Sequence, residues 1–345
     1  MQTAAVILAA GASSRFGSPK QLARVGGRTI LEIVAQVATN AGLAPVIVVV
    51  SPTLTVPANV VPVINDAPSE GMSQSLRLGL AAVPAEADAA MVLLGDQPTV
   101  SRDTLTAILD AARGDRPVVA ARAHGRIGPP VLLLREAFGL ATEVSGDEGL
   151  RVILAQHPEL VTEVDVKEHA LDVDTPEDLA ALIGPCPGCG ATFLALPNGA
   201  VHEYTGASAA CWAAFGELLA REFQGAAYGW IHRHTVDMYT VQHPGTNDRR
   251  QRQSVALHLI GLCHWLEHNM DMRQLNPITQ RLASEDRDWP WLTPPTTYGM
   301  TVLDVLSACD ADEHGRAVHA WAESVWESWS AHHELIRRWA DEALH

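Results

Sequence analysis

The chain opens with an apolar run at 4–8 that continues directly into a loop rich in alanine, glycine and serine. A short apolar run bounded by a turn predicts a buried strand, and small residues let the loop backbone approach a ligand closely. The loop also carries Arg15 and Lys20, and Lys167 is the only other lysine in the chain. A strand, a glycine-rich turn and an ammonium group are typical of a polyphosphate site. The first turn of an ordinary α/β domain would look the same, so both interpretations stay open at this point.

Further apolar runs predict the sheet that this strand would join. The runs at 45–50 and 60–64 are typical of fully buried strands, and 89–94 is a third. A capping box formed by Thr29 and Glu32 predicts a helix that runs to about residue 40. Strands that alternate with helices indicate a Rossmann-like α/β fold, a mostly parallel sheet with helices on both faces. Ligands bind such sheets at the carboxyl ends of the strands, where the opening loop would lie.

The composition changes sharply near residue 184. All five cysteines, all nine tryptophans and twelve of the fifteen histidines follow that point. In a chain of 345 residues we therefore expect two domains, 1–184 and 185–345. Apolar residues at helical spacing over 208–223, 254–270 and about 312–344 predict that the second domain is mainly α-helical. One such stripe reads as packed core rather than as a cofactor site, and its residues are Trp321, Val325, Trp329, Ile336 and Trp339.

The charge and the apolar pattern exclude several classes of protein. The net charge of −16 divides equally between the two parts, so neither has the basic surface that nucleic-acid binding needs. No apolar run approaches the roughly 18 residues of a membrane span, and no cation precedes Arg15 as a secretory signal would require. An odd number of cysteines fits a reducing compartment. We therefore expect a cytoplasmic protein without nucleic-acid or membrane partners.

Two further motifs extend the candidate phosphate site. A helix is expected to begin near Met72, where Gly71, Ser73 and Ser75 offer backbone and hydroxyl groups to a base or ribose. Helix capping is the alternative, and for Ser73 alone it is the favoured one. Asp96 follows the run at 89–94 within Gly-Asp-Gln-Pro. A carboxylate at the carboxyl end of a strand, beside a phosphate loop, is well placed to bind Mg²⁺, although a lone Asp before a turn is more often a cap.

In this order, the motifs of 1–184 resemble those of the molybdenum cofactor cytidylyltransferases, within the wider nucleotidyltransferase group. The resemblance implies a fold of the nucleotide-diphospho-sugar transferase type. Leu-Ala-Ala-Gly at 8–11 is similar to the cytidylyl branch, because the guanylyl branch usually has Leu-Ala-Gly-Gly, and this implies CTP as the donor. The motifs are Leu-Ala-Ala-Gly-x-Ser-Ser-Arg-x-Gly-x-x-Lys from residue 8, Glu-Gly-Met-Ser-x-Ser-Leu from 70, Gly-Asp-Gln-Pro from 95, Gly-Asp-x-Gly from 146 with Arg151, and Asp-Val-Asp-Thr-Pro-Glu-Asp from 172.

The resemblance implies transfer of CMP from CTP to the terminal phosphate of molybdopterin, with release of pyrophosphate. Asp96 would hold Mg²⁺, with Asp174 as a second ligand, and Arg15 and Lys20 would neutralise the triphosphate. Asp174 could instead only support a helix that begins at Thr175-Pro. The residues implied to hold the cytidine are Ala10, Gly11, Gly71 and Ser75. Those implied to flank the pterin phosphate are Gly128, Pro129, Gly146 and Asp147.

The acceptor is less well defined than the nucleotide. Pro129 stands where the family usually has His in Gly-His-Pro, and related enzymes of this branch include a pyridine-dye reductase. One alternative is therefore a nucleotidyltransferase for another phosphorylated acceptor. A different alternative is a non-catalytic protein that binds the cofactor and docks a molybdenum oxidoreductase. Arg15, Lys20 and Asp96 together argue against the latter, because a pure binder needs no metal carboxylate.

A separate motif opens the second domain. Cys186 and Cys189 in Cys-Pro-Gly-Cys form half of a zinc site, whose other ligands would come from Cys211, Cys263 or the histidines. A reduced surface turn or a redox pair are the alternatives. The histidines, which are dense at 232–234, 243, 258 and 332–333, could bind a metal within a helical bundle or simply form polar contacts. With Cys-Pro-Gly-Cys-Gly and Val-Gln-His-Pro-Gly at 241–245, the segment resembles an uncharacterised bacterial domain, which implies no function.

Overall fold

The computed structural model describes all residues except 12, 113, 147–148, 168–169, 197–198 and 309. It forms two compact units, Met1–Ala181 and Leu182–His345. The second unit begins just before residue 184, where the composition changes, because Ile183–Pro185 (β10) pairs with Thr192–Leu194 (β11). Among the described residues, no helix combines the length and the hydropathy that a membrane span requires.

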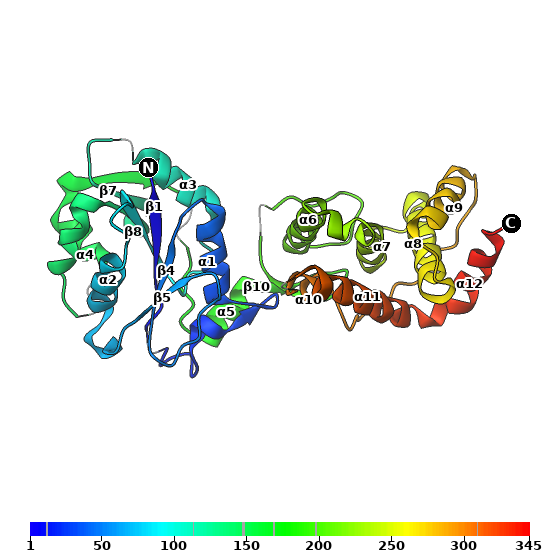
Figure 1. Cartoon of the computed structure of the whole chain (residues 1–345), viewed down its shortest axis with the longest axis horizontal. Coiled ribbons are helices and arrows are strands. Elements are labelled where there is room, and N and C mark those ends of the chain that lie inside the picture. Colours follow the sequence, from blue (N-terminus) through cyan, green and yellow to red (C-terminus); the bar gives the residue numbers. More distant parts are fainter. Residues whose placement is uncertain (12, 113, 147–148, 168–169, 197–198, 309) are drawn as a thin grey trace. The chain divides into compact units, whose positions relative to one another are not determined.

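In the residues that the structure describes, a sheet of seven strands forms the centre of the first unit (Figure 1). The strand order is β5-β4-β1-β6-β8-β7-β9. Among the strand pairs of this sheet in the described residues, only those that β8 makes are antiparallel. The prediction of a mostly parallel sheet is therefore confirmed. Its strands are β1 (Thr3–Leu8), β4 (Val46–Val50), β5 (Val61–Ile64), β6 (Ala89–Leu94), β7 (Val118–Ala123), β8 (Arg126–Leu134) and β9 (Val161–Asp165), and a small hairpin consists of β2 (Arg24–Val25) and β3 (Arg28–Thr29).

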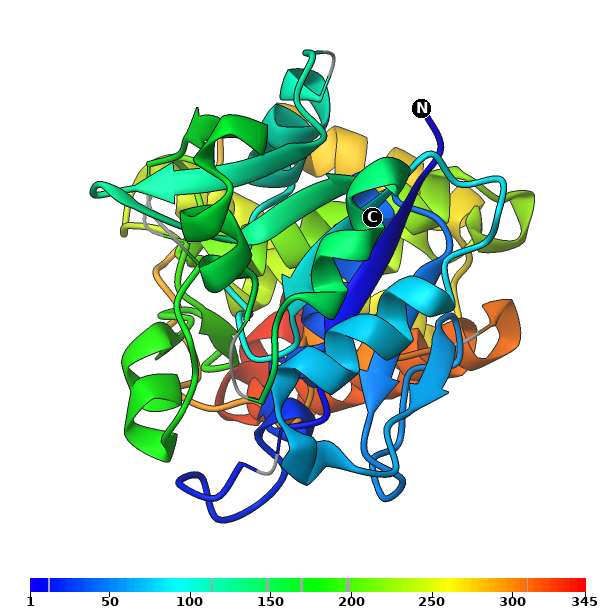
Figure 2. The same cartoon turned by 90° about the vertical axis from the view of Figure 1, so that its left-hand side faces the viewer.

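Helices cover both faces of this sheet (Figure 2). Alternate residues of β1 enter different cores: Val6 packs with α2 and α4 on one face, and Ile7 packs with α1 and α3 on the other. The helices are α1 (Ile30–Asn40), α2 (Met72–Ala81), α3 (Arg102–Ala111), α4 (Leu150–Gln156) and α5 (Pro176–Leu182), with 3₁₀ turns at Lys20–Leu22, Pro68–Glu70, Arg135–Thr142 and Pro158–Leu160.

Local predictions hold for α1 but fail in part for β5. The predicted capping box is present: Glu32 N donates to Thr29 Oγ1 at 3.1 Å, and Thr29 N donates to Glu32 Oε2 at 2.6 Å. The expectation that 60–64 is fully buried is wrong, because Val61 and Ile64 are each 46% exposed. β5 lies at the edge of the sheet, beside β4 alone. An apolar run does not distinguish a central strand from an edge strand.

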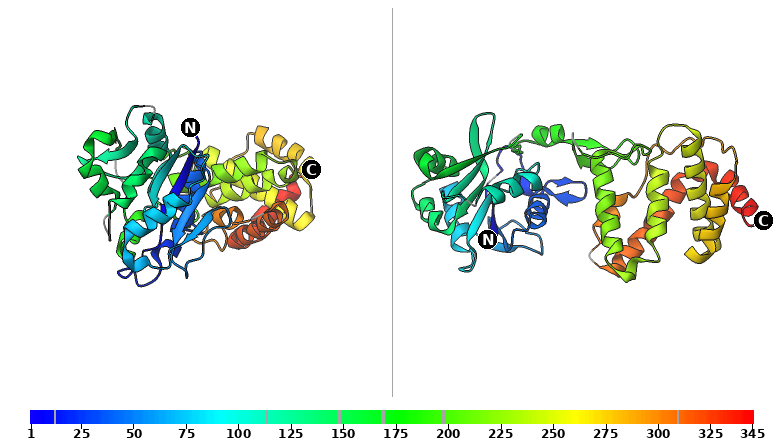
Figure 3. Two further views of the ribbon diagram at one scale, coloured as in Figure 1. Left: turned by 60° about the vertical axis from the view of Figure 1, so that its left-hand side comes forward. Right: turned by 90° about the horizontal axis from the view of Figure 1, so that it is seen from above.

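The second unit is mainly helical, as predicted. In the right-hand view of Figure 3, α6 to α9 lie side by side and the later helices cross them. Contacts between elements agree, since α10 packs on α6, α11 on α7 and α12 on α8. The helices are α6 (Ala209–Phe223), α7 (His232–Gln242), α8 (Arg249–His268), α9 (Met272–Ser284), α10 (Val302–Leu306), α11 (Ala311–Ser328) and α12 (His333–Glu342), with 3₁₀ turns at Ala226–Tyr228 and Ser330–His332.

The predicted tryptophan stripe is core, but it is not carried by one helix. Trp321, Val325, Trp329 and Ile336 are fully buried, and Trp339 is nearly so. The helical spacing expected over about 312–344 is divided between two helices, because α11 ends at Ser328 and a 3₁₀ turn precedes α12. The break changes the direction of the chain so that α11 and α12 each pack on α8.

Candidate functional site

The opening loop and the Asp96 turn leave the sheet side by side. Leu8 pairs with Leu94 at the carboxyl ends of β1 and β6, and Gly95 N donates to Leu8 O at 2.9 Å. A Cβ added at Gly95 would lie 2.8 Å from Ala9 Cβ and 3.2 Å from Leu8 O. The two chain segments therefore approach this closely only because residue 95 is glycine.

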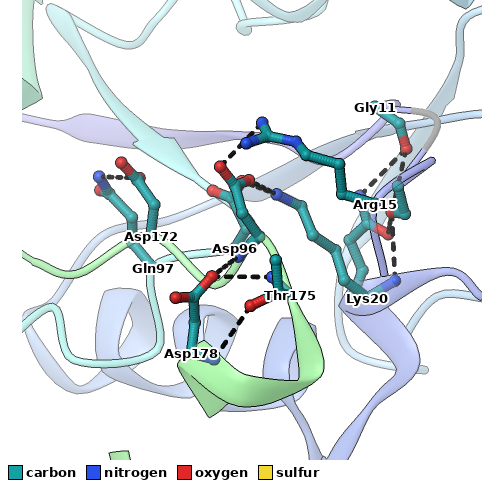
Figure 4. Close-up of polar contacts among 11 residues, drawn as sticks. Gly11, Arg15, Lys20, Asp96, Gln97, Asp172, Thr175 and Asp178 are labelled. Carbon is teal, nitrogen blue, oxygen red and sulfur yellow. Dashed lines mark hydrogen bonds and ion pairs between the residues drawn. The ribbon is translucent and has the colours of Figure 1, made fainter. Parts of the chain in front are cut away.

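Two cations of the first loop reach two aspartates from distant parts of the chain. Lys20 Nζ lies 2.6 Å from Asp96 Oδ2 and 2.8 Å from Asp174 Oδ1. Arg15 Nη2 lies 2.9 Å from Asp174 Oδ2, although its side chain is 72% exposed. Figure 4 shows Arg15 and Lys20 extending from the first loop toward the acidic group around Asp96. The structure thus brings together the four residues for which the sequence suggests a charge-handling role.

The segment that carries Asp174 is held against the Asp96 turn. Val173 N donates to the backbone oxygen of Asp96 at 3.0 Å. Gln97 Nε2 donates to Asp172 Oδ1 at 2.9 Å, a contact that Figure 4 shows. Sequence reasoning missed the pairing of Gln97 with Asp172. Both residues lie in the quoted motifs, but nothing in the motifs indicates that one side chain binds the other.

The start of α5 is capped without the carboxylate of Asp174. Asp178 Oδ2 accepts hydrogen bonds from Asp174 N at 3.1 Å and Thr175 N at 2.8 Å, and Asp178 N donates to Thr175 Oγ1 at 3.1 Å. The Asp174 side chain is therefore free of the capping role and faces Lys20 and Arg15 instead. This geometry favours the ligand interpretation of Asp174 over helix support.

Lys20, Asp174 and Asp96 differ in how well neighbouring groups stabilise their charged forms. Burial by itself lowers the pKa of Lys20, but hydrogen bonds to Asp174 and Asp96 outweigh it and the pKa is raised. The hydrogen bond from Lys20 lowers the pKa of Asp174. Burial raises the pKa of Asp96, and the nearby charge of Asp172 adds to this although Lys20 opposes it. Asp96 is therefore a carboxylate whose charge would be stabilised by a further cation.

The loop between β1 and Lys20 is folded by its own side chains. Ser13, which has a positive φ of 52°, accepts from Lys20 N at 3.2 Å and donates to Gln21 Oε1 at 3.2 Å. Gln21 Nε2 donates to the backbone oxygen of Gly11 at 3.4 Å. A Cβ at Gly11 would meet nothing within 4 Å, whereas Ala10 is buried. Gly11 thus faces open space at the position expected to approach a nucleotide, and the roles of Ser13 and Gln21 were missed.

The predicted nucleotide and acceptor loops touch at the start of α2. Gly71 has a φ of +91° directly before this helix. Ser73 N donates to the backbone oxygen of Gly146 at 3.1 Å. Ser75 Oγ accepts from Asn65 Nδ2 at 3.0 Å, and both side chains are buried. Ser75 therefore holds the loop after β5 in place as well as lying where a nucleotide contact was expected.

The rest of the predicted acceptor site lies around β8. Gly128 lies beside Arg151, since a Cβ at this glycine would be in ordinary contact with Arg151 Nε at 3.6 Å, and Pro129 follows it half-buried in the strand. Asp147 lies outside the described residues. Among the described residues, no hydrogen bond or ion pair joins Gly128, Pro129 or Gly146 to the carboxylates that bind Lys20.

In the second unit, four potential metal ligands converge. The ligand atoms of Cys186, Cys189, Cys211 and His243 all lie within 4.8 Å of one another, and every one of these residues is buried. Cys263 lies elsewhere, with its Sγ 3.9 Å from Glu267 Oε2. The sequence could name Cys211 and a histidine only as members of a larger pool, because the choice depends on how the helices pack.

Two histidines, one in α7 and one in α8, have carboxylate partners that the sequence did not reveal. His258 Nδ1 donates to Asp237 Oδ1 at 2.6 Å, and Arg233 Nε donates to the same oxygen at 2.9 Å. His232 Nδ1 donates to Glu222 Oε2 at 2.9 Å. Both carboxylates are buried. These two histidines hydrogen-bond to carboxylates, and within the described residues neither of them joins a group of potential metal ligands.

Comparisons with known proteins divide the chain in the same way. The MobA-like NTP transferase domain matches residues 5–161, and a family of unknown function (DUF5946) matches residues 184–330. The nicotine blue oxidoreductase of Paenarthrobacter nicotinovorans is 34% identical over 198 residues, which span 52% of this chain and 95% of that protein. A probable molybdenum cofactor guanylyltransferase of Bacillus cereus is 33% identical over 132 residues, 36% of this chain and 64% of that protein.

Solved structures are also similar to this chain. The crystal structure of Rv0371c from Mycobacterium tuberculosis H37Rv shares 30% identity with a TM-score of 0.47, covering 53% of this chain and 97% of that one. The complex of Rv0371c with manganese shares 29% identity with a TM-score of 0.46, over 53% and 98% of the two chains.

Proposed function

The chain belongs, through residues 5–161, to the MobA-like NTP transferase domain family, and from this premise we propose that it transfers CMP from CTP to the phosphate of molybdopterin. One observation carries the proposal. Lys20 Nζ lies within 2.8 Å of carboxylate oxygens of both Asp96 and Asp174, directly after a loop whose Gly11 faces open space. Cations and carboxylates placed beside an open glycine loop are what a triphosphate with its metal requires.

The proposed reaction needs no covalent intermediate on the protein. A phosphate oxygen of the acceptor attacks the α-phosphorus of the nucleotide, and a new P–O bond forms as the bond to the departing pyrophosphate breaks. Catalysis then depends on positioning and on neutralising the charge of the triphosphate. Lys20 and Arg15 supply positive charge, and the backbone around Ala10 and Gly11, with Gly71 and Ser75, holds the nucleoside.

The cofactor in this proposal is Mg²⁺. The side chains present fit it, because Asp96 and Asp174 already converge on one cation, the Lys20 ammonium, and Mg²⁺ takes one or two carboxylates together with phosphate oxygens. When bound, the ion would stabilise charge on the triphosphate. It would compete with Lys20 for the carboxylates, so Lys20 would become available to the phosphates.

A second candidate function is the same transfer reaction with GTP in place of CTP as the donor. Leu-Ala-Ala-Gly at 8–11 favours CTP, whereas the similar proteins from Bacillus cereus are named as probable guanylyltransferases, which favours GTP. The relative named nicotine blue oxidoreductase makes a redox reaction the competing class. Pro129, where the family usually has His, keeps another phosphorylated acceptor as an alternative for the second substrate.

The proposal also concerns the whole chain. We assign the transfer reaction to the first domain, 1–184, and give the second domain, 185–345, no part in the chemistry. Because nucleoside triphosphates are cytoplasmic substrates, we place the protein in the cytoplasm. A molybdenum oxidoreductase would receive the product, and this makes it the expected protein partner.

The test incubates the purified full-length chain with Mg²⁺, molybdopterin and either CTP or GTP. We expect pyrophosphate and a pterin dinucleotide to appear in equal amounts, with faster turnover of CTP. Faster turnover of GTP would support the second candidate. Formation of neither product, from a folded protein and with both nucleotides, would exclude transfer to molybdopterin and leave the redox class or another acceptor.

A further inference from the structure

Three segments of the second unit bring four metal-binding side chains to one point. Cys186 and Cys189 lie on the turn between β10 and β11, Cys211 lies in the first turn of α6, and His243 directly follows α7. Cys211 Sγ is 3.9 Å from Cys189 Sγ and 3.3 Å from His243 Nε2. A tetrahedral zinc ion with zinc–sulfur bonds of about 2.3 Å separates its sulfur ligands by roughly 3.8 Å. The observed spacing already matches this geometry.

The histidine is held in the tautomer that a metal needs. His243 Nδ1 lies 2.7 Å from the backbone oxygen of Tyr239, and because a carbonyl oxygen only accepts, Nδ1 carries the hydrogen. Nε2 therefore presents its lone pair toward Cys211. A histidine ligand oriented by a hydrogen bond from its other nitrogen is typical of protein metal sites.

Hydrogen-bond donors lie beside two of the sulfur atoms. Ser208 N donates to Cys186 Sγ at 3.3 Å, and the Tyr239 hydroxyl donates to Cys211 Sγ at 3.6 Å. Zinc binding would release the thiol protons to solvent, so the ion with three thiolates and a neutral imidazole would carry a net charge of −1. Hydrogen bonds to the sulfurs spread this remaining charge.

The backbone of the turn is shaped to reach the histidine. A Cβ at Gly188 would lie 2.5 Å from His243 Cδ2 and 2.8 Å from the backbone oxygen of Gln242. A Cβ at Gly206 would lie 2.5 Å from the backbone oxygen of Pro244. Both glycines let the chain close around the group, so the convergence of the ligands depends on the local sequence.

We propose that Cys186, Cys189, Cys211 and His243 bind one zinc ion, and that this ion is structural. Three sulfur donors and one nitrogen select zinc over the hard cations that oxygen ligands hold. Four protein ligands fill the tetrahedron, and all four residues are at most 3% exposed, so no position is open to a substrate. The ion would fix the turn between β10 and β11 to α6 and α7. This site is independent of the nucleotide reaction proposed above.

The experiment measures metal in the full-length protein. We expect one zinc per chain, and replacement by Co²⁺ should give the visible absorption of a tetrahedral site together with sulfur-to-cobalt charge-transfer bands. Cys211→Ser and His243→Ala should reduce zinc to a small fraction of one per chain. Cys263→Ser is the matched control, because this buried thiol lies outside the group, and it should keep all its zinc.

Two further measurements separate a ligand from a packing residue. His243→Cys should retain zinc, since four thiolates also complete a zinc site, whereas His243→Ala should not. Zinc, but not Mg²⁺, should restore the near-ultraviolet circular dichroism of protein that a chelator has stripped. Wild-type protein with no stoichiometric zinc and no tetrahedral cobalt spectrum would overturn the proposal. Equal zinc loss in Cys263→Ser and Cys211→Ser would also overturn it.

Discussion

Two aspartates, Asp96 of the first unit and Asp237 of the second, differ in how neighbouring groups balance the charge of the carboxylate. Burial raises the pKa of Asp96, and among the residues that the structure describes the cation paired with it, Lys20, is shared with Asp174. Burial would also raise the pKa of Asp237, but contacts with His234 and His258 and the charge of Arg233 lower it well below its ordinary value. Asp96 thus contacts a cation that it shares with Asp174, whereas Oδ1 of Asp237 accepts hydrogen bonds from both Arg233 and His258.

This difference separates a site that a ligand can reach from a cluster that is enclosed within the protein. The carboxylates near Lys20 are partly accessible, and Arg15 beside them is mostly exposed, so a metal and a polyphosphate can replace the existing pairs. Asp237 is fully enclosed and its partners come from the same helix pair. Poorly compensated charge at the end of a parallel strand points to function, whereas well compensated charge within a bundle points to stability.

The largest expected effect, on the free energy of unfolding, comes from neutralising Asp237. Asp237→Asn leaves Arg233 and His258 without their shared carboxylate, and losing one partner of a buried ion pair costs about 3–5 kcal/mol. We expect a decrease of this size in the free energy of unfolding at neutral pH, measured by urea denaturation. An equally stable variant would show that the cluster contributes nothing net.

The same variant gives a pH dependence of known sign. Because the pKa of Asp237 is lowered by folding, its stabilisation is present above the unfolded pKa, near 3.8, and is lost as the pH falls below it. The difference in stability between wild type and Asp237→Asn should therefore be constant near neutrality and shrink below about pH 4. A difference that grows on acidification would contradict the assigned pKa direction.

Asp96→Asn tests the carboxylate that is proposed to bind Mg²⁺. We expect kcat for nucleotide transfer to fall by at least about 10², because the change removes a metal ligand from the step in which charge develops. Stability should change little, since the substitution also relieves the burial of a charge. Asp165→Asn is the control: this exposed carboxylate pairs with Arg122 and should leave kcat unchanged. Wild-type activity in Asp96→Asn would place the metal elsewhere.

Two glycines of the first unit, Gly95 and Gly11, distinguish a tightly packed position from one beside open space. Gly95→Ala should destabilise the protein by about 1–3 kcal/mol, because its Cβ would overlap Ala9 and the backbone of Leu8. Gly11→Ala should change stability by less than about 0.5 kcal/mol, since no atom lies within 4 Å of the new Cβ. Thermal unfolding compares the two, and the nucleotide KM should rise for Gly11→Ala. Equal destabilisation would contradict the open space at Gly11.

The smallest expected effect distinguishes the roles of two aspartates near the start of α5, Asp174 and Asp178. Asp178→Asn weakens the cap of this helix and should lower the melting temperature slightly, with the Mg²⁺ dependence of activity unchanged. Asp174→Asn should instead raise the Mg²⁺ concentration needed for half-maximal rate. The same Mg²⁺ dependence in both variants would return Asp174 to a purely structural role.

Local patterns predicted the sheet and the charged centre of the first unit well. Lys20, Asp96 and Asp174 each follow a strand or precede a helix in a recognisable motif, so their approach follows from the topology of a parallel sheet. The hydrogen bond between Gln97 and Asp172 could not be predicted, because an amide side chain carries no sign of its distant partner.

In the second unit the sequence gives residue types but not their pairing. Cys211 and Cys263 are equivalent as candidates until α6 and α7 place one of them beside His243. The partners of His258 were hidden in the same way, since Asp237 looks like any helical aspartate. The division of 312–344 into two helices also depends on packing against α8, which periodicity alone does not contain.

The most direct test of the account follows both metals in one sample. The full-length protein is dialysed into metal-free buffer, its zinc is measured, and pyrophosphate release is followed with CTP and molybdopterin before and after Mg²⁺ is added. We predict that one zinc per chain remains and that pyrophosphate appears only after Mg²⁺ is added. Pyrophosphate release without Mg²⁺, or no release after Mg²⁺ is added to folded protein that retains its zinc, would contradict it.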